Sequence, residues 1–171
     1  MKFKTITAYT GPKGVGKSTI SERDKQATES CDQSAEILSF ATPIKEMLRA
    51  ILPPEAFTTE GKDDVRYGLC GKTPRFLMQT LGTEWGRKIV GETIWTDVMK
   101  NKIHESKADK IFIDDLRFDN EAIAIKELNG EIIKLEREEI GYSEEHESEK
   151  PISEKYIDKT VRIETLNSKP S

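Results

Sequence analysis

A glycine-rich segment near the start of the sequence carries the residues best suited to hold phosphate. Residues 11–18, GPKGVGKS, fit the pattern G-x-x-x-x-G-K-[ST] and follow an apolar segment. Glycines let backbone N–H groups wrap a phosphate without Cβ clashes, and a following helix adds the partial positive charge of its N-terminus. Lys17 would neutralise the β- and γ-phosphates, and Ser18 would offer its hydroxyl to Mg²⁺. The ATP-binding residues predicted here are Gly11, Lys13, Gly14, Val15, Gly16, Lys17, Ser18 and Thr19.

A second group of charged residues follows the apolar segment IFI, residues 111–113. Asp114, Asp115 and Arg117 come directly after it. Burying such groups is costly unless each has a partner. We expect Asp115, or else its neighbour Asp114, to hold Mg²⁺ directly or through water, while the other acid is an exposed turn residue. Arg117 would hold a second phosphate opposite the first.

Strands and helices that must position these residues alternate along the sequence. This alternation predicts βαβ units, and hence an α/β fold in three layers with a central, mainly parallel five-stranded sheet flanked by helices. Ligands bind such sheets at the carboxyl ends of the strands, where both groups of residues lie. The predicted strands are residues 3–9, 36–40, 110–114, 131–136 and 160–164. The predicted helices are residues 17–29, 43–51, 74–81, 84–104 and 119–129.

Composition narrows the classes of protein that fit. The 171 residues are enough for one domain, and the net charge of −4 with no block of lysine or arginine argues against binding to a nucleic-acid backbone. No segment reaches the roughly 20 apolar residues of a membrane span. Cys31 and Cys70 lie far apart without a C-x-x-C pattern, which argues against a disulfide framework or a zinc site. A cytoplasmic protein is therefore expected.

Several cations in the middle of the sequence could form a second phosphate site. Arg75 and Gln79 are four residues apart and would share one helix face. Gly82 is expected to end that helix, and Arg87 to begin the next one. Two arginines flanking such a turn can converge on a phosphate, and Lys45 would add a third positive group. For each cation alone, an ordinary solvated surface position is the alternative.

Two other features each allow two interpretations. Trp95 begins a stripe of apolar residues at helical spacing, so it either packs in the core or stacks on a base. The acid-rich segment that follows Arg137 is either a solvated loop or a lid that closes over the site. In the second case Arg137 would stabilise the charge on the phosphoryl group during transfer.

Together these segments resemble the deoxynucleoside monophosphate kinases encoded by bacteriophages. The resemblance implies one P-loop kinase domain over residues 1–171, with an acceptor-binding helical insertion at about 41–104 and a lid-like loop at about 137–153. The segments that carry it are, in order, GPKGVGKS (11–18), FATPIKEMLR (40–49), TPRFLMQTLGTEWGR (73–87), DDLRFDNEA (114–122), and Arg137 with HESE (146–149).

The resemblance also implies an activity, which is ATP-dependent phosphoryl transfer to a deoxynucleoside 5′-monophosphate with Mg²⁺. Its partners would be nucleotides, in the host cytoplasm if the gene belongs to a phage, and a homodimer is possible. The implied catalytic residues are Lys17, Arg137 and Asp115, and the implied metal ligands are Ser18 and Asp115, partly through water. The implied substrate-binding residues are Lys45, Arg75, Gln79, Arg87, Trp95, Arg117 and Glu121.

Two alternatives to this activity stay open on the residues alone. Another small-molecule P-loop kinase, acting on a coenzyme precursor or a phosphorylated isoprenoid, would share the ATP site and differ at residues 73–95. A nucleotide-binding module without catalysis would bind ATP without acceptor-dependent release of ADP. A GTPase is disfavoured, because the sequence lacks the N-K-x-D pattern that would recognise guanine.

Overall fold

The computed structural model describes residues 4–142 and 150–164, and the chain divides into two compact units. Unit 1 comprises residues 1–39 and 100–171, and unit 2 comprises residues 40–99. Unit 2 occupies most of the range for which the sequence predicts a helical insertion. The role of that insertion in binding an acceptor stays a prediction.

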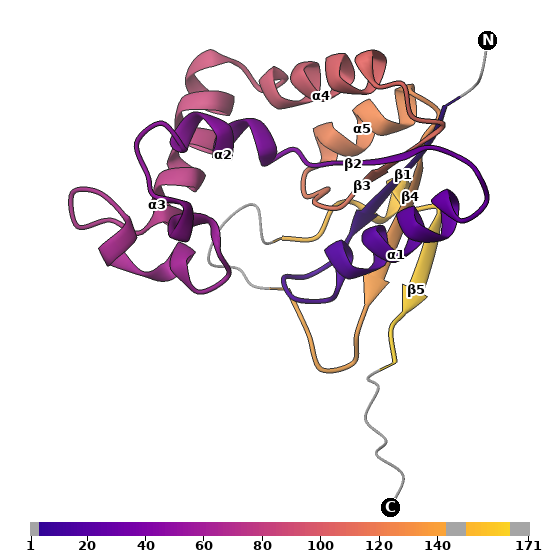
Figure 1. Ribbon diagram of the computed structural model, residues 1–171, viewed down its shortest axis with the longest axis horizontal. Helices are drawn as coiled ribbons and strands as arrows, with labels where there is room; N and C mark the ends of the chain where they lie inside the picture. Colours follow the sequence, from indigo (N-terminus) through magenta and orange to yellow (C-terminus); the bar gives the residue numbers. More distant parts are fainter. Residues whose placement is uncertain (1–3, 143–149, 165–171) are drawn as a thin grey trace, which may run out of the picture. The chain divides into compact units, whose positions relative to one another are not determined.

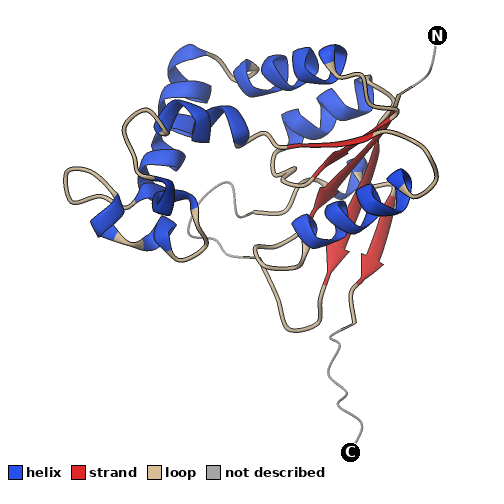
Figure 2. Cartoon of the chain, in the orientation of Figure 1, coloured by secondary structure: helices blue, strands red, loops and turns tan. Residues whose placement is uncertain are grey.

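The chain contains five strands and five α-helices among its described residues, and a run of helices separates β2 from β3 (Figures 1 and 2). The strands are β1 (Thr5–Thr10), β2 (Ala35–Leu38), β3 (Lys110–Ile113), β4 (Glu131–Glu136) and β5 (Lys159–Arg162). The α-helices are α1 (Lys17–Glu29), α2 (Thr42–Leu48), α3 (Pro74–Gln79), α4 (Ile94–Glu105) and α5 (Asp119–Glu127). A π-helical segment spans Thr80–Val90, and short 3₁₀ turns span Pro54–Phe57, Gly61–Asp63, Val65–Tyr67 and Glu154–Tyr156.

The five strands of unit 1 form one sheet in the order β2-β3-β1-β4-β5. Every neighbouring pair is parallel, so the predicted α/β fold with a central parallel sheet is confirmed. Helix α1 lies on one face of the sheet and α5 on the other (Figure 1). Because β1 is the middle strand, the loop that follows it is flanked by the carboxyl ends of β3 and β4.

The sequence explains why these strands are central. Along β1 the last three residues are all buried, and in β3 the three residues after Lys110 are apolar and buried, as expected for strands covered on both faces. On the face of the sheet that α1 covers, Tyr9, Val15, Phe112 and Leu135 form a buried apolar cluster. On the other face, Gly130 leaves room for Ile125 of α5, because a Cβ there would lie 2.5 Å from the Ile125 Cγ2. Among the described residues no helix is long and apolar enough to cross a bilayer.

Unit 2 is helical and has its own apolar cluster, centred on Leu48, Leu52 and Ala56. Helix α3 begins where the Thr73 hydroxyl accepts a hydrogen bond from the Phe76 N–H at 3.2 Å, with Pro74 at the first helical position. The strand predictions and most helix predictions hold to within a few residues. The helix boundaries around Gly82 are wrong, because the predicted helices 74–81 and 84–104 are replaced by one helical segment that ends at Val90 and a separate helix, α4, that begins at Ile94.

The helix predicted to end at Gly82 continues to Val90, and the break comes at Gly91, where φ is 158°. The widened winding is seen in the Gly91 N–H bond to the Gly86 carbonyl, five residues back, at 2.9 Å. Gly82 is used for packing instead of for a turn, because a Cβ there would lie only 3.0 Å from Ile44 Cδ1.

Candidate nucleotide-binding site

The glycine-rich loop between β1 and α1 has a backbone that only glycine adopts readily. Gly11 and Gly16 have φ values of 146° and 111°, in the left-handed region. A Cβ on Gly11 would also lie 2.6 Å from the Leu135 carbonyl oxygen of β4. The loop therefore keeps its shape through both backbone freedom and close contact with the neighbouring strand, and α1 begins immediately after it at Lys17.

Lys17 lies inside this loop and does not project into solvent. It is 9% exposed, and its Nζ donates hydrogen bonds to the carbonyl oxygens of Gly11 at 2.7 Å and Pro12 at 2.9 Å. Val15, also predicted as a nucleotide contact, is fully buried in the core, so its side chain anchors the loop. The other predicted contacts in the loop, Lys13, Gly14, Ser18 and Thr19, are exposed.

The acid beside the loop is Asp114, the first residue after β3. The Ser18 hydroxyl donates to Asp114 Oδ2 at 3.1 Å, and the Ser39 hydroxyl, which follows β2, donates to Asp114 Oδ1 at 2.5 Å. The sequence favours Asp115 as the metal-binding acid, and the structure places its neighbour Asp114 against Ser18. Both acids follow the end of β3, so either lies near the loop along the chain.

On the other side of the loop lies Arg137, the first residue after β4. A Cβ built on Gly16 would lie 3.6 Å from Arg137 Nη2, so the guanidinium group is next to the loop. Arg137 Nε is buried and has no hydrogen-bond partner within the described part of the chain. A short backbone bridge between Arg137 and Ile140 turns the chain back, and the Ile140 side chain approaches Gly14. The residues 146–149 of the predicted lid lie outside the described residues.

Glu121 has a clear structural partner in the turn after β3. Its side chain is 2% exposed, and Oε2 accepts the backbone N–H groups of Arg117 at 2.9 Å and Phe118 at 3.2 Å. The sequence analysis placed Glu121 among the substrate contacts. In the structure it fixes the backbone that carries Arg117, and Arg117 itself is half-buried.

In unit 2 the helix from residue 74 to residue 90 carries Arg75, Gln79 and Arg87, all half-buried. Arg75 is held side-on by Asp63, whose carboxylate accepts from Nε and Nη2, the latter at 2.9 Å. Lys45 is half-buried on α2. Three of the predicted acceptor residues thus lie on one continuous helix, whereas the sequence predicted two helices separated at Gly82.

Trp95 is a packing residue in unit 2. Its side chain is 3% exposed, and its indole N–H donates to the Gly82 carbonyl oxygen at 2.8 Å. Gly86 lies against the ring, because a Cβ there would come within 2.7 Å of Trp95 Cζ2. The core alternative therefore accounts for Trp95. The base-stacking alternative would require a ring face that this packing already covers.

Sequence reasoning missed two polar residues that hold site residues in place, Ser39 and Asp63. The signal for Ser39 was available, because it lies at the carboxyl end of a predicted strand, 36–40, which should lie beside the carboxyl end of the Asp114 strand. Asp63 gave no comparable signal, since it lies in an irregular segment of mixed charge. Within the described residues no three His, Cys, Asp or Glu side chains gather into a metal cluster.

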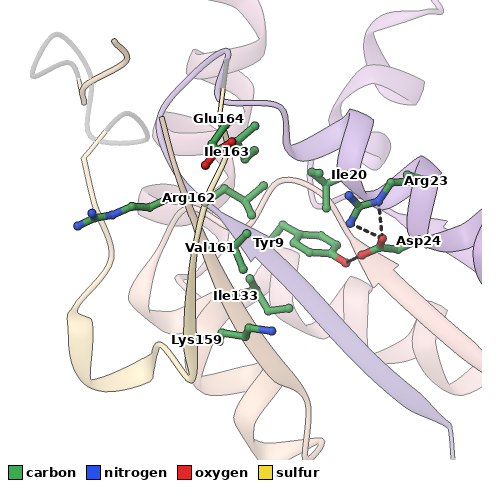
Figure 3. Close-up of a pocket in the computed structure, with 11 residues that line it drawn as sticks. Tyr9, Ile20, Arg23, Asp24, Ile133, Lys159, Val161, Arg162, Ile163 and Glu164 are labelled. Atoms are coloured by element: carbon green, nitrogen blue, oxygen red, sulfur yellow. Dashed lines mark hydrogen bonds and ion pairs between the residues drawn. The ribbon is translucent and has the colours of Figure 1, made fainter. Parts of the chain in front are cut away.

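A separate hollow of about 520 Å³ lies between α1 and β5 on the face of the sheet (Figure 3). Apolar residues line most of it, and three of its polar side chains bind one another. The Tyr9 hydroxyl donates to Asp24 at 2.6 Å, and Arg23 pairs with the same carboxylate at 2.8 Å. Burial, and then this bond to Asp24, raise the pKa of Tyr9. Tyr9, Arg23 and Asp24 of the hollow thus satisfy one another, whereas Arg137 Nε beside the glycine loop has no hydrogen-bond partner among the described residues.

Comparisons with known proteins point to one family. The family model described as "Deoxynucleotide monophosphate kinase" matches residues 72–168. The deoxynucleoside-5′-monophosphate kinase of Escherichia phage T5 is 32% identical over 130 residues, which cover 71% of this chain and 50% of that protein. A provisionally named deoxynucleotide monophosphate kinase of Acanthamoeba polyphaga mimivirus is 31% identical over 159 residues, covering 81% of this chain and 77% of that protein. The match thus spans about half the length of the phage relative.

Proposed function

This chain belongs to the deoxynucleotide monophosphate kinase family, and we propose that it transfers the terminal phosphoryl group of ATP to a deoxynucleoside 5′-monophosphate, giving ADP and the diphosphate. One observation carries the proposal. A glycine loop that holds Lys17 has a carboxylate, Asp114, beside its serine and a guanidinium, Arg137, beside its third glycine. Both signs of charge are needed where a metal and a transferring phosphoryl group meet.

The donor site is proposed to use the loop and its two flanking residues. Lys17 would exchange the two loop carbonyls for phosphate oxygens, a change that only requires its flexible side chain to turn. Arg137, with a buried Nε donor that lacks a protein partner among the described residues, would donate to the phosphoryl group in transfer. Val15 would keep the loop anchored through its buried side chain.

The residues beside the loop suit Mg²⁺. The Ser18 hydroxyl and the Asp114 carboxylate already lie 3.1 Å apart, and Mg²⁺ takes oxygen ligands from one or two protein groups while keeping several waters. We propose these two as its protein ligands, with Asp115 reaching it through water. When bound, the ion neutralises charge on the phosphates.

The acceptor is proposed to be held by arginines, since their forked geometry suits a monophosphate. In unit 1, Arg117 is proposed as an acceptor contact, carried by the turn that Glu121 braces. In unit 2, taken by itself, the proposed acceptor contacts are Arg75, Arg87 and Lys45. The side-on bond from Asp63 supports a role for Arg75, because it fixes the plane of the guanidinium group. Gln79, one helical turn from Arg75, would read a base edge, since an amide both donates and accepts.

Catalysis in this proposal is direct transfer without a covalent intermediate. The chain contributes alignment of the two phosphates and positive charge around a loose, in-line transition state.

The test is ADP production by the full chain with a panel of acceptors. Deoxynucleoside 5′-monophosphates should stimulate ADP release, while nucleosides without the 5′-phosphate should not, because the arginines would then lack their partner. Coenzyme precursors and phosphorylated isoprenoids belong in the same panel. Stimulation by one of these, with none by any deoxynucleoside monophosphate, would refute the proposed substrate class.

A matched pair of lysine variants ties the activity to the glycine loop. Lys17→Ala should lower turnover by several orders of magnitude. The chain should still fold, with a loss of stability of about 1–3 kcal/mol from the two hydrogen bonds to Gly11 and Pro12. Lys25→Ala, on the same helix and paired among the described residues with Glu29 at 4.0 Å at the surface, should leave turnover unchanged. Equal activity of both variants would remove the loop from the mechanism.

A further inference from the structure

Asp114 has a hydroxyl partner on each of its two carboxylate oxygens, and the partners come from different segments. Ser18 of the glycine loop donates to Oδ2 at 3.1 Å, and Ser39 donates to Oδ1 at 2.5 Å. The second contact follows from the register of the sheet. Leu38 of β2 pairs with Ile113 of β3, so the next residue on each strand, Ser39 and Asp114, meet beyond the strand ends.

The two bonds do different things to the carboxylate. The χ2 torsion of aspartate is broad, so a single bond to Ser18 leaves the carboxylate plane free to turn. A second hydroxyl on the opposite oxygen fixes that plane and leaves Oδ2 directed at Ser18. Because its acceptor is a carboxylate, the Ser39 bond is charge-assisted, and such bonds are roughly twice as strong as neutral ones.

We propose that Ser39 is a positioning residue for the metal site: by holding Asp114 Oδ1, it orients Oδ2 and so sets how tightly the divalent cation of the nucleotide complex is bound. This inference rests on the proposed function, because it takes Asp114 and Ser18 as the residues that face the cation. Ser39 would touch neither the nucleotide nor the metal. Its effect would be transmitted through the carboxylate it holds, as outer partners of metal ligands commonly do.

The sheet supplies a matched control at its opposite edge. Ser34 and Asp109 precede the same two strands, next to the pair Ala35 and Lys110. The Ser34 hydroxyl donates to Asp109 Oδ2 at 2.9 Å. This is the same type of bond, between the same two strands, at the amino end where no ligand is proposed. Ser34→Ala therefore measures how much a serine–aspartate hydrogen bond between β2 and β3 contributes to stability alone.

The experiment measures binding instead of turnover. ADP affinity of the full chain is determined by calorimetry with and without Mg²⁺, and Mn²⁺ binding to the ADP complex is followed by electron paramagnetic resonance. Ser39→Ala should weaken Mn²⁺ binding about 10-fold, in the range known for outer partners of metal ligands, and should leave metal-free ADP affinity unchanged. Ser39→Thr, which keeps the hydroxyl, should restore most of the metal affinity. Ser34→Ala should lower the free energy of unfolding without changing metal binding.

Three results would overturn the inference: wild-type Mn²⁺ affinity in Ser39→Ala, equal weakening of ADP with and without metal, or the same metal defect in Ser34→Ala. If Ser39→Ala does not fold, Ser39→Cys replaces it, since the weak thiol donor should give the same metal defect at nearly the same size. A wild-type chain whose ADP affinity does not depend on Mg²⁺ would refute the proposed metal site and this inference with it. A wild-type chain that shows the dependence, with an unaffected Ser39→Ala, would refute only the role of Ser39.

Discussion

Replacing the buried Glu121 with alanine is expected to lower the free energy of unfolding by about 2–4 kcal/mol. The carboxylate accepts two backbone N–H groups, those of Arg117 at 2.9 Å and Phe118 at 3.2 Å, at the start of α5. Glu121 is also 2% exposed, so alanine leaves both a cavity and two donors without their acceptor. The turn that carries Arg117 depends on these bonds.

The magnitude follows from the two bonds. Hydrogen bonds to a charged group contribute about 1.5–3 kcal/mol each, which sets an upper bound of about 6 kcal/mol. Both bonds are only part-buried, so water can satisfy the amides in part, and about half of that value should be observed. At this chain length 1 kcal/mol shifts Tm by about 2–4 °C, so the midpoint should fall by about 4–16 °C. Urea unfolding at neutral pH and thermal melts measure both quantities.

Glu121→Gln is the matched variant, because it keeps the length of the side chain and one oxygen acceptor. It should lose about 1 kcal/mol, mainly through loss of the charge. The reasoning would be refuted if Glu121→Ala unfolded within 0.5 kcal/mol of Glu121→Gln, a margin of about the error expected for such comparisons. A stable Glu121→Ala with a strongly raised KM for the monophosphate would instead support the substrate contact predicted from the sequence.

Three further outcomes are expected. Gly86→Ala should cost about 1–3 kcal/mol of stability, because its Cβ would lie 2.7 Å from Trp95 Cζ2 and the indole is held by its own hydrogen bond. Arg137→Ala should lower kcat about 30- to 1000-fold with a modest change in KM, since its contact is proposed to form mainly with the transferring phosphoryl group. Asp158 has a lowered pKa, caused first by the hydrogen bond from Lys126. Its contribution to the free energy of unfolding should therefore be complete above about pH 4 and lost as pH falls further. Urea unfolding of the wild type and of Asp158→Asn at a series of pH values measures this contribution.

Each of these outcomes has a control on the same element or pair. Gly82→Ala places a Cβ 3.0 Å from the flexible end of Ile44, so it should stay within about 1 kcal/mol of wild type; an equal loss would remove Trp95 from the explanation. Arg117→Ala should raise KM for the monophosphate instead of lowering kcat, and a KM effect alone in Arg137→Ala would contradict its role in transfer. Lys126→Gln should reduce the pH dependence that Asp158 causes without abolishing it, because the Ile132 N–H still donates to the Asp158 carboxylate at 2.7 Å. An unchanged dependence would show that Lys126 is not the main cause of the lowered pKa.

The fold could be predicted from the sequence because each strand is a short apolar run between polar, helical segments. The helix predicted over residues 17–29 has the same bounds in the structure, since the glycine loop before it fixes where it begins. The end of the helix from residue 74 to residue 90 could not be predicted, because a glycine in a helical pattern indicates either the end of the helix or a close packing contact. Local sequence does not say which. Here Gly82 and Gly86 pack against Ile44 and Trp95, and tertiary contact outweighs the low helix propensity of glycine.

The residue types of the candidate site were predictable, but not which of two neighbours faces inward. Asp114 and Asp115 are equivalent in the sequence, and the choice depends on the register of β3 against β2, which no local pattern encodes. The same holds for Arg75, whose partner Asp63 lies twelve residues away in an irregular segment. Partners of this kind are set by how segments fold together, so sequence reasoning could name the cations and acids without pairing them.

The strand order explains why this loop has a carboxylate on one side and a guanidinium on the other. With β1 in the middle, the residues that directly follow β3 and β4 must lie on opposite flanks of the loop, and these residues are Asp114 and Arg137. Lys17 lies between them, so a phosphate chain in the loop would meet a metal-binding acid on one flank and a cation on the other. Exchanging the two residues would place like charge beside the phosphates and a second cation beside Ser18. The separation of charge at this site is therefore a consequence of sheet topology, with each strand end contributing one sign.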